Sequence, residues 1–137
     1  MRCDATTKPF NGRIALLADD DELFRRYVAF VLRRMGFLVI ASSDGPGALE
    51  KAWRFTGRID LLVTSLKLPC IAGVDLAEQV RAQSQQIKVL FLVEPTFGRF
   101  QGVGGEPGIV AKPFLPAVLS QKVEELFKTP SGSADLP

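Results

Sequence analysis

Short uninterrupted apolar runs, separated by segments with helical spacing, constrain the fold of this chain most strongly. A strand with one solvent-exposed face alternates apolar and polar residues, whereas a strand covered on both faces is apolar throughout. Strands of the second kind are predicted at residues 13–18, 37–41, 59–64, 88–93 and 109–111. Because strands and helices alternate, we expect an α/β fold with a parallel sheet and right-handed crossovers.

The segments between the runs are predicted to be helices, because their apolar residues recur at intervals of three and four. In the first helix, between Asp21 and Gly36, the residues Leu23, Tyr27 and Phe30 are expected on the buried face. Asp21 is expected to cap the start of this helix, and Gly36 to end it in a left-handed conformation. Further helices, with Trp53, Val74, Leu115 and Val118 among their predicted buried residues, are expected at 47–56, 74–85 and 115–128.

Residues 94–108 interrupt the alternation, because they are rich in glycine and proline. Each glycine inside a helix costs about 1 kcal/mol relative to alanine, so we predict a mobile loop there rather than a full helix. This stretch also contains Phe97, Arg99 and Phe100. These three side chains are expected either to contact a partner or to fold back over the sheet.

The chain of 137 residues has the length of one domain, which we predict to span residues 13–128. Residues 1–12 are expected to form a flexible leader, and residues 129–137 a disordered tail or linker. No apolar run approaches the roughly 20 residues of a membrane span. No output domain is expected after residue 128, so DNA binding is not predicted for this chain.

The composition narrows the chemistry further. A formal charge of +2 is too small to indicate a nucleic acid or an anionic membrane as the partner. The two cysteines, Cys3 and Cys70, make no disulfide framework, so a reducing cytoplasm is expected. The chain has no histidine, which excludes histidine metal sites, Ser-His triads and a phosphohistidine.

Ser65 directly follows the third apolar run, which ends at Thr64. Ligands and reacting groups in an open α/β sheet lie just beyond the carboxyl ends of the strands, so Ser65 is expected at such a position. Leu66 to Pro69 stop the strand, and Gly73 is expected to free the backbone for the next helix. The Ser65 hydroxyl is a candidate nucleophile or phosphorylation site, but without a convincing base we favour a hydroxyl with no chemical role.

The chain resembles the receiver (response regulator) domain of bacterial two-component signalling over about residues 13–128. The matching motifs, in order, are Leu16–Asp21, Arg25, Gly36–Val39, Gly45 with Ala48–Leu49, Asp60–Val63, Leu68–Pro69 with Gly73, and Lys112–Phe114. Each motif alone is weak evidence for the family, and the resemblance depends on their order and spacing together. It implies a flavodoxin-like, doubly wound sheet of five parallel strands, with the fourth helix shortened or missing in the glycine-rich stretch.

The resemblance also implies a set of site residues. In that family a pair of acidic residues after the first strand binds Mg²⁺, and an aspartate ending the third strand accepts a phosphoryl group. A lysine near the end of the domain binds the phosphate. Asp19 and Asp20 match the acidic pair, and Lys112 matches the lysine.

Three positions depart from the family pattern. Ser65 stands at the position of the acceptor aspartate, and Asp60 cannot replace it because it begins the same strand at the far end. Val93, followed by Glu94, stands at a switch position where the family has Thr or Ser. Ile109 stands at the second switch position, where the family has an aromatic residue.

These departures together lead to the hypothesis of a degenerate receiver that is not an enzyme, is not phosphorylated and acts by protein–protein interaction. The expected partner is a histidine kinase, another response regulator or a second copy of the chain, bound through the last helix, the fifth strand and the glycine-rich stretch. The alternative is a Mg²⁺-dependent phosphoacceptor receiver with an unusual acceptor residue. A third hypothesis is a sensor that binds a small ligand in the acidic pocket.

No cofactor is expected to be required. Asp19 and Asp20 are expected to hold Mg²⁺ only weakly, because one carboxylate ligand of the family is missing. Without the cation, Lys112 is expected to lie close to Asp20 and form an ion pair with it. The Lys112–Pro113 peptide bond is predicted to be cis, and the lone thiol of Cys70 beside the pocket is predicted to be inert.

Overall fold

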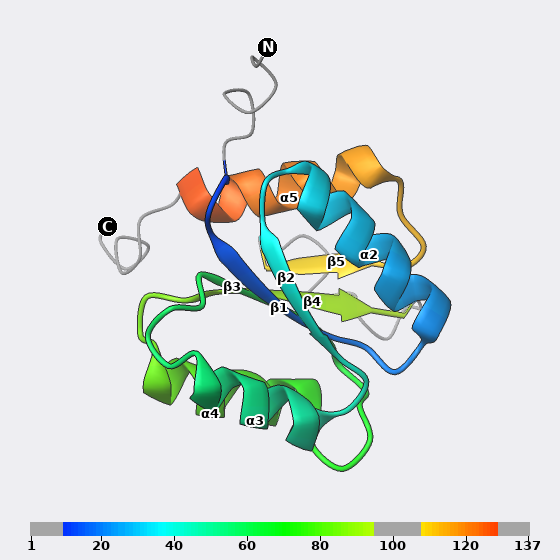
Figure 1. Cartoon of the computed structure of the whole chain (residues 1–137). Coiled ribbons are helices and arrows are strands. Elements are labelled where there is room, and N and C mark those ends of the chain that lie inside the picture. The colour runs from blue at the N-terminus through cyan, green and yellow to red at the C-terminus, as the bar shows by residue number, and fades with distance from the viewer. Residues whose placement is uncertain (1–9, 95–107, 129–137) are drawn as a thin grey trace, which may run out of the picture.

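The computed structural model describes residues 10–94 and 108–128, which form one parallel sheet covered by helices on both faces (Figure 1). The strands are β1 (Ile14–Ala18), β2 (Leu38–Ser42), β3 (Leu61–Ser65), β4 (Lys88–Val93) and β5 (Ile109–Ala111). The helices are α2 (Glu22–Arg34), α3 (Gly45–Arg54), α4 (Gly73–Gln83) and α5 (Pro116–Lys128). The predicted α/β fold with a doubly wound, five-stranded parallel sheet is confirmed, and the element ends differ from the prediction by one or two residues.

The strand order β2-β1-β3-β4-β5 brings the functional candidates to one edge of the sheet. All neighbouring strands are parallel, so their carboxyl ends lie together. Along the chain, β1 is followed by a strand on one side of it and then by one on the other, which makes the β1–β3 boundary the topological switch point. Asp19, Ser65 and Lys112 all lie at or just after a carboxyl end on this edge.

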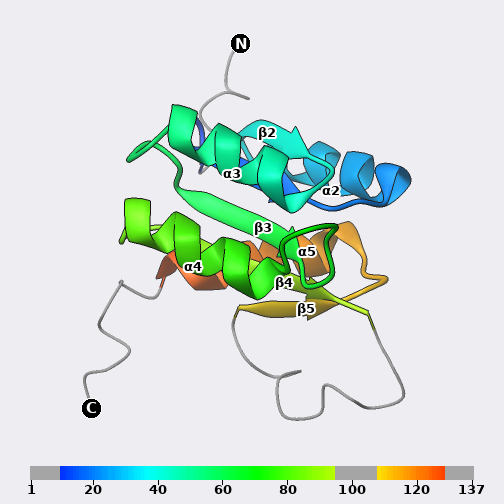
Figure 2. The same ribbon diagram turned by 90° about the horizontal axis from the view of Figure 1, so that it is seen from below.

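The continuous apolar pattern of the strands is explained by helices on both faces. Leu17 and Val63 belong to a core under α2 and α5, whereas Leu16 and Leu62 belong to a core under α3 and α4. Figure 1 shows α3 and α4 below the sheet, and Figure 2, seen from below, shows them side by side across β3. Successive side chains of a strand point to opposite faces, so both sets of leucines and valines are withdrawn from water.

Both predicted ends of the first helix are confirmed. The Asp21 side chain accepts a hydrogen bond from the Phe24 amide at 3.1 Å, which satisfies one free donor of the first turn. At the other end Gly36 has a φ of +111°. A Cβ atom at Gly36 would lie 2.6 Å from the Asn11 nitrogen, so both the backbone conformation and the available space require glycine.

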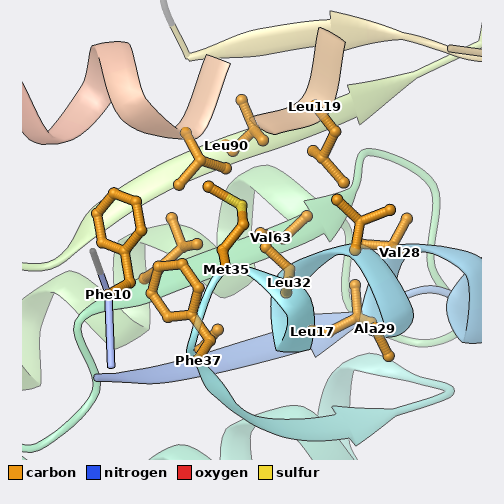
Figure 3. Packing of buried hydrophobic residues seen from close by; sticks show 14 of the residues in the cluster. Phe10, Leu17, Val28, Ala29, Leu32, Met35, Phe37, Val63, Leu90 and Leu119 are labelled. Atoms are coloured by element: carbon orange, nitrogen blue, oxygen red, sulfur yellow. The ribbon is translucent and has the colours of Figure 1, made fainter. Parts of the chain in front are cut away.

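Phe10 lies within the predicted leader, residues 1–12, and is buried in the core. Its ring stacks on Phe37 with centroids 4.9 Å apart, and Figure 3 shows the two rings side by side. Phe127 of α5 lies against the same ring, also at 4.9 Å. The sequence around Phe10 has no strand or helix pattern, so nothing local indicated that this ring closes the end of the core.

Trp53 was predicted to lie in the core, and this prediction is wrong, because 59% of the residue is exposed. The buried positions of α3 include Gly45, Ala48 and Ala52. These residues are small, so the helix backbone lies close to the layer beneath it and leaves no room for an indole ring. Trp53 therefore lies at the margin of the buried stripe.

The predicted buried faces of the other helices also need correction. In α2 the residues Val28 and Leu32 are fully buried, whereas Leu23 and Phe30 are exposed. The reason is that α2 is apolar around much of its circumference, so more than one stripe satisfies the spacing of three and four residues. Other residues predicted to face inward but found exposed are Val74, Leu115 and Val118.

Several predictions fall on residues outside the described ranges. These are the shortened or missing fourth helix and the mobile loop, both predicted at residues 94–108, of which residues 95–107, with Phe97, Arg99 and Phe100, lie outside. The predicted tail, residues 129–137, and most of the predicted leader also lie outside.

We predict that Phe10→Ala lowers the free energy of unfolding by about 3 kcal/mol, because it removes a buried ring packed on Phe37 and Phe127. Trp53→Ala also removes an aromatic ring, but an exposed one, and is expected to change this free energy by less than about 0.5 kcal/mol. Urea unfolding followed by circular dichroism measures both values. Equal losses in the two variants would contradict the burial of Phe10.

Candidate functional site

Asp19 is fully buried at the carboxyl end of β1 and is held there through its backbone and one carboxylate oxygen. The Asp19 amide donates to the Ser42 carbonyl at 3.1 Å, and Arg25 donates from Nη1 to the Asp19 carbonyl at 2.8 Å. Oδ1 accepts a hydrogen bond from the Asp21 amide at 3.0 Å. Because the main chain and Oδ1 are occupied, Oδ2 is the atom that Asp19 presents to the site.

Lys112, directly after β5, is the partner of that oxygen. Its Nζ lies 3.0 Å from Asp19 Oδ2, and only 10% of the lysine side chain is exposed. Oδ2 nevertheless accepts no hydrogen bond among the described residues, so the contact is an attraction of charges rather than a directed hydrogen bond. The predicted pairing of Lys112 with Asp20 is wrong. Asp20 is exposed, since successive side chains leaving a strand point in different directions.

Glu94, directly after β4, is a second anionic partner of Lys112 that the sequence reasoning missed. Its Oε2 lies 3.6 Å from Lys112 Nζ, and 65% of its side chain is exposed. β4 and β5 are neighbouring parallel strands, and the Lys112 amide donates to the Val93 carbonyl at 2.8 Å. An acid after one predicted strand and a lysine after the next could have indicated this contact, but only if the two strands were known to be neighbours.

Aromatic residues of α2 hold the lysine in place. Lys112 Nζ lies 4.5 Å from the centre of the Phe24 ring, within the range of a cation–π contact. The Phe24 ring packs edge-on against Phe114 at 5.1 Å, and the Tyr27 hydroxyl donates to the Phe114 carbonyl. Burial raises the pKa of Tyr27. The Lys112–Pro113 peptide bond is cis, as predicted.

Ser65 is the last residue of β3 and is buried. Its backbone lies so close to residue 73 that this position must be glycine. A Cβ atom at Gly73 would lie 2.1 Å from the Ser65 carbonyl oxygen. Gly73 also donates its amide to the Leu66 carbonyl at 2.8 Å. Gly73 was expected to supply backbone freedom. The structure shows instead that glycine is needed here for lack of space, because the start of α4 lies directly against the end of β3.

The two predicted switch positions are apolar and lie at different levels of the sheet. Val93 is buried at the carboxyl end of β4. Ile109 is half-buried at the first residue of β5, opposite Phe91. Neither side chain has a polar atom, so neither could hydrogen-bond an anion held by Lys112.

Asp60 lies at the opposite edge of the sheet from this arrangement of charges. Asp60 precedes β3, where its carboxylate accepts a hydrogen bond from the Ile14 amide at 2.8 Å. It therefore stabilises the amino end of the sheet, as its place in the sequence indicated. Cys70 is an exposed, free thiol with a φ of +75° in the loop after β3, and its lack of reactivity stays a prediction.

The donors at the site do not fit Mg²⁺ in this arrangement. Mg²⁺ prefers an octahedron of oxygen ligands that includes one or two carboxylates. Asp19 Oδ2, which lacks a hydrogen bond, would suit a cation, but the Lys112 ammonium already lies 3.0 Å from it. Within residues 10–94 and 108–128, no cluster of three or more Asp, Glu, His or Cys side chains is arranged to hold a metal ion.

The fold and this edge of the sheet agree with the comparisons with known proteins. The family model of the response regulator receiver domain matches residues 15–124. The chemotaxis protein CheY of Pseudomonas aeruginosa is 33% identical over 123 residues, which cover 85% of this chain and 98% of that protein. The chain therefore belongs to the response regulator receiver domain family of two-component signalling.

Other relatives include a longer protein and a solved receiver protein of similar length. The alkaline phosphatase synthesis transcriptional regulatory protein PhoP of Bacillus subtilis is 31% identical over 116 residues, and the match covers 82% of this chain but 48% of that regulator. A response regulator receiver protein from Sinorhizobium medicae has a TM-score of 0.73 and 26% identity, over 85% of this chain and 95% of that one.

A receiver domain of a sensor histidine kinase from Pseudomonas aeruginosa, solved with a magnesium ion in its active site cleft, has a TM-score of 0.66. It is 23% identical over 86% of this chain and 99% of that one, a level that shows the shared fold alone. Receiver domains in general are non-enzymatic signalling modules that interact with histidine kinases and other response regulators. Among the described helices, none has the length and apolar character needed to cross a membrane.

We predict that Asp19→Asn lowers the free energy of unfolding by about 3 kcal/mol, because it leaves the Lys112 ammonium with a weaker, largely exposed counter-ion. Combining it with Lys112→Met removes both charges, so the double variant is expected to lose less than the sum of the two single losses. Urea unfolding of the four proteins gives the coupling between the two side chains. Strictly additive losses would contradict the buried ion pair.

We also predict that Gly73→Ala lowers the free energy of unfolding by about 2–3 kcal/mol, because its Cβ would overlap the Ser65 carbonyl. Gly57→Ala is the control, since it has a positive φ but no neighbouring atom within 4 Å, and it is expected to cost about 1 kcal/mol. Amide resonances of Ser65 and Leu66 should shift in the Gly73 variant alone. A smaller loss at Gly73 than at Gly57 would show that space is not the reason for this glycine.

Proposed function

We propose that this receiver domain works in two-component signalling without being phosphorylated, as a protein-interaction module. The observation that carries the proposal is that Lys112 is already paired with carboxylates of the chain itself. Lys112 already lies between the Asp19 and Glu94 carboxylates and the Phe24 ring. At the same edge, β3 ends in the hydroxyl of Ser65, where the resemblance to the family calls for a carboxylate.

The chemistry of a hydroxyl supports this proposal. A serine becomes a nucleophile when a neighbouring base takes its proton. The chain has no histidine, and the buried carboxylate of Asp19 is already paired with Lys112. The apolar side chains of Val93 and Ile109 add no hydrogen bond for a phosphoryl group. These features together favour a domain whose conformation does not follow a phosphorylation cycle.

The partner we propose is a histidine kinase, another response regulator or a second copy of the chain. The start of α5 and the residue before it offer an apolar surface for such a contact, since 70% of Leu115 is exposed and Val118, in the first turn of α5, is also exposed. α5 packs against β4 and β5, at the side of the sheet that ends in β5. A cytoplasmic location is part of the proposal, because the exposed Cys70 is a free thiol.

The second candidate is a Mg²⁺-dependent phosphoacceptor receiver with an unusual acceptor residue. Two observations favour it over any other alternative. Asp19 Oδ2 accepts no hydrogen bond from the described residues, and the neighbouring Asp20 carboxylate is exposed. For this candidate to hold, Lys112 would have to move away from Asp19 when the cation binds.

Acetyl phosphate separates the two candidates. We predict that the chain incubated with acetyl phosphate and Mg²⁺ gains no mass of a phosphoryl group, measured on the intact protein by mass spectrometry. Ser65→Asp, which restores a carboxylate at the end of β3, is expected to gain an acid-labile phosphoryl group under the same conditions.

The variant serves as the control for the donor and the assay. A phosphoryl adduct on the unaltered chain, whether acid-labile as on a carboxylate or acid-stable as on a serine, would overturn the first candidate and support the second. A Ser65→Asp variant that folds but is not labelled would show that the missing carboxylate is not the reason for the lost chemistry.

A further inference from the structure

Two carboxylates neutralise the ammonium of Lys112. An ammonium with little exposure to water needs nearby anions, and only 10% of the Lys112 side chain is exposed. Asp19 supplies one carboxylate at 3.0 Å and Glu94 a second at 3.6 Å. Ser65 supplies no charge. The second carboxylate at this site therefore comes from the end of β4, one strand away from the end of β3.

The register of the sheet explains how a carboxylate after β4 can stand in for one at the end of β3. β3 and β4 are neighbours, with Ser65 paired to Leu92. Glu94 follows Leu92 by two residues and lies just after the end of β4. It is therefore at the same edge of the sheet as Ser65. On its other side β4 pairs with β5, where the Lys112 amide bonds to the Val93 carbonyl at 2.8 Å. The Glu94–Lys112 ion pair thus extends the β4–β5 ladder by one side-chain contact.

We propose that Glu94 is a positioning residue that acts as a built-in counter-ion of Lys112, in place of a carboxylate or phosphoryl group at the end of β3. It keeps the lysine directed toward the ends of β1 and β4 and makes the ammonium less attractive to free anions such as phosphate. This inference rests on the proposed function, since it explains how the domain holds one arrangement of its edge without phosphorylation.

The exposure of Glu94 determines which measurement is informative. With 65% of its side chain in water, the ion pair adds little to the free energy of unfolding. The charge still acts on an anion that approaches Lys112. One unit charge at about 5 Å in a largely solvated site changes an anion affinity by about fivefold. Anion binding and the position of Lys112 are therefore better readouts than stability.

The test compares Glu94→Gln, which removes the charge and keeps the shape, with Glu50→Gln. Glu50 is a matched control, because it pairs with Arg54 at 3.2 Å and is 62% exposed. Inorganic phosphate is titrated into each protein while the Lys112 amide resonance is followed by NMR. In Glu94→Gln we expect that resonance to shift before phosphate is added, and phosphate to bind about fivefold more tightly than in the unaltered chain.

The Glu50 variant is expected to match the unaltered chain in both readouts. In a Lys112→Met background, Glu94→Gln is expected to change phosphate binding no further. If Glu94→Gln leaves the Lys112 resonance and the phosphate affinity where Glu50→Gln leaves them, Glu94 is not a counter-ion of Lys112 and the inference is overturned.

Failure of this inference can be told apart from failure of the proposed function. A chain that accepts a phosphoryl group from acetyl phosphate at a residue other than Glu94 would overturn the proposed function alone. Labelling at Glu94 itself, located by peptide mapping, would overturn both. Equal behaviour of the two glutamine variants in an unlabelled chain would overturn only the role of Glu94.

Discussion

The ion pair between Asp19 and Lys112 holds together the edge of the sheet where every functional candidate lies. It joins the ends of β1 and β5, which are separated in the sheet by β3 and β4. Both side chains are withdrawn from water, so each compensates much of the other's lost hydration. The ammonium is further restrained by the Phe24 ring, and the turn that carries Lys112 is attached to α2 through Phe114. Displacing this lysine would therefore disturb strands and a helix together.

This constraint is the physical basis of our proposal that the domain works without being phosphorylated. A lysine that must bind an incoming phosphoryl group has to be available to it, and here the ammonium lies between two carboxylates. Apolar side chains at Val93 and Ile109 remove the hydrogen bond that would report such a group. In that proposal the two side chains act in the same direction, because neither can hydrogen-bond a phosphoryl group. Exposed apolar residues, Leu115 just before α5 and Val118 within it, form the surface that we propose for a partner.

Much of the fold could be predicted from local patterns, and much of the site could not. The apolar runs located every strand within one or two residues, and the caps Asp21 and Gly36 located the ends of the first helix. Trp53 was misplaced because helical spacing shows which residues share a face but not how closely the helix lies to the layer beneath it. Phe10 was missed because it packs through contacts with Phe37 and Phe127 that are distant along the chain.

The sequence by itself determined the parallel α/β sheet and the group of polar residues at its carboxyl edge, because both depend on short-range periodicity and on a general property of parallel strands. Only the tertiary structure decided that Lys112 meets Asp19 and Glu94 rather than Asp20. It also decided that Gly73 is needed for space beside Ser65. These outcomes depend on strand order, register and the direction in which each side chain leaves its strand, and such quantities arise only when distant segments pack against one another.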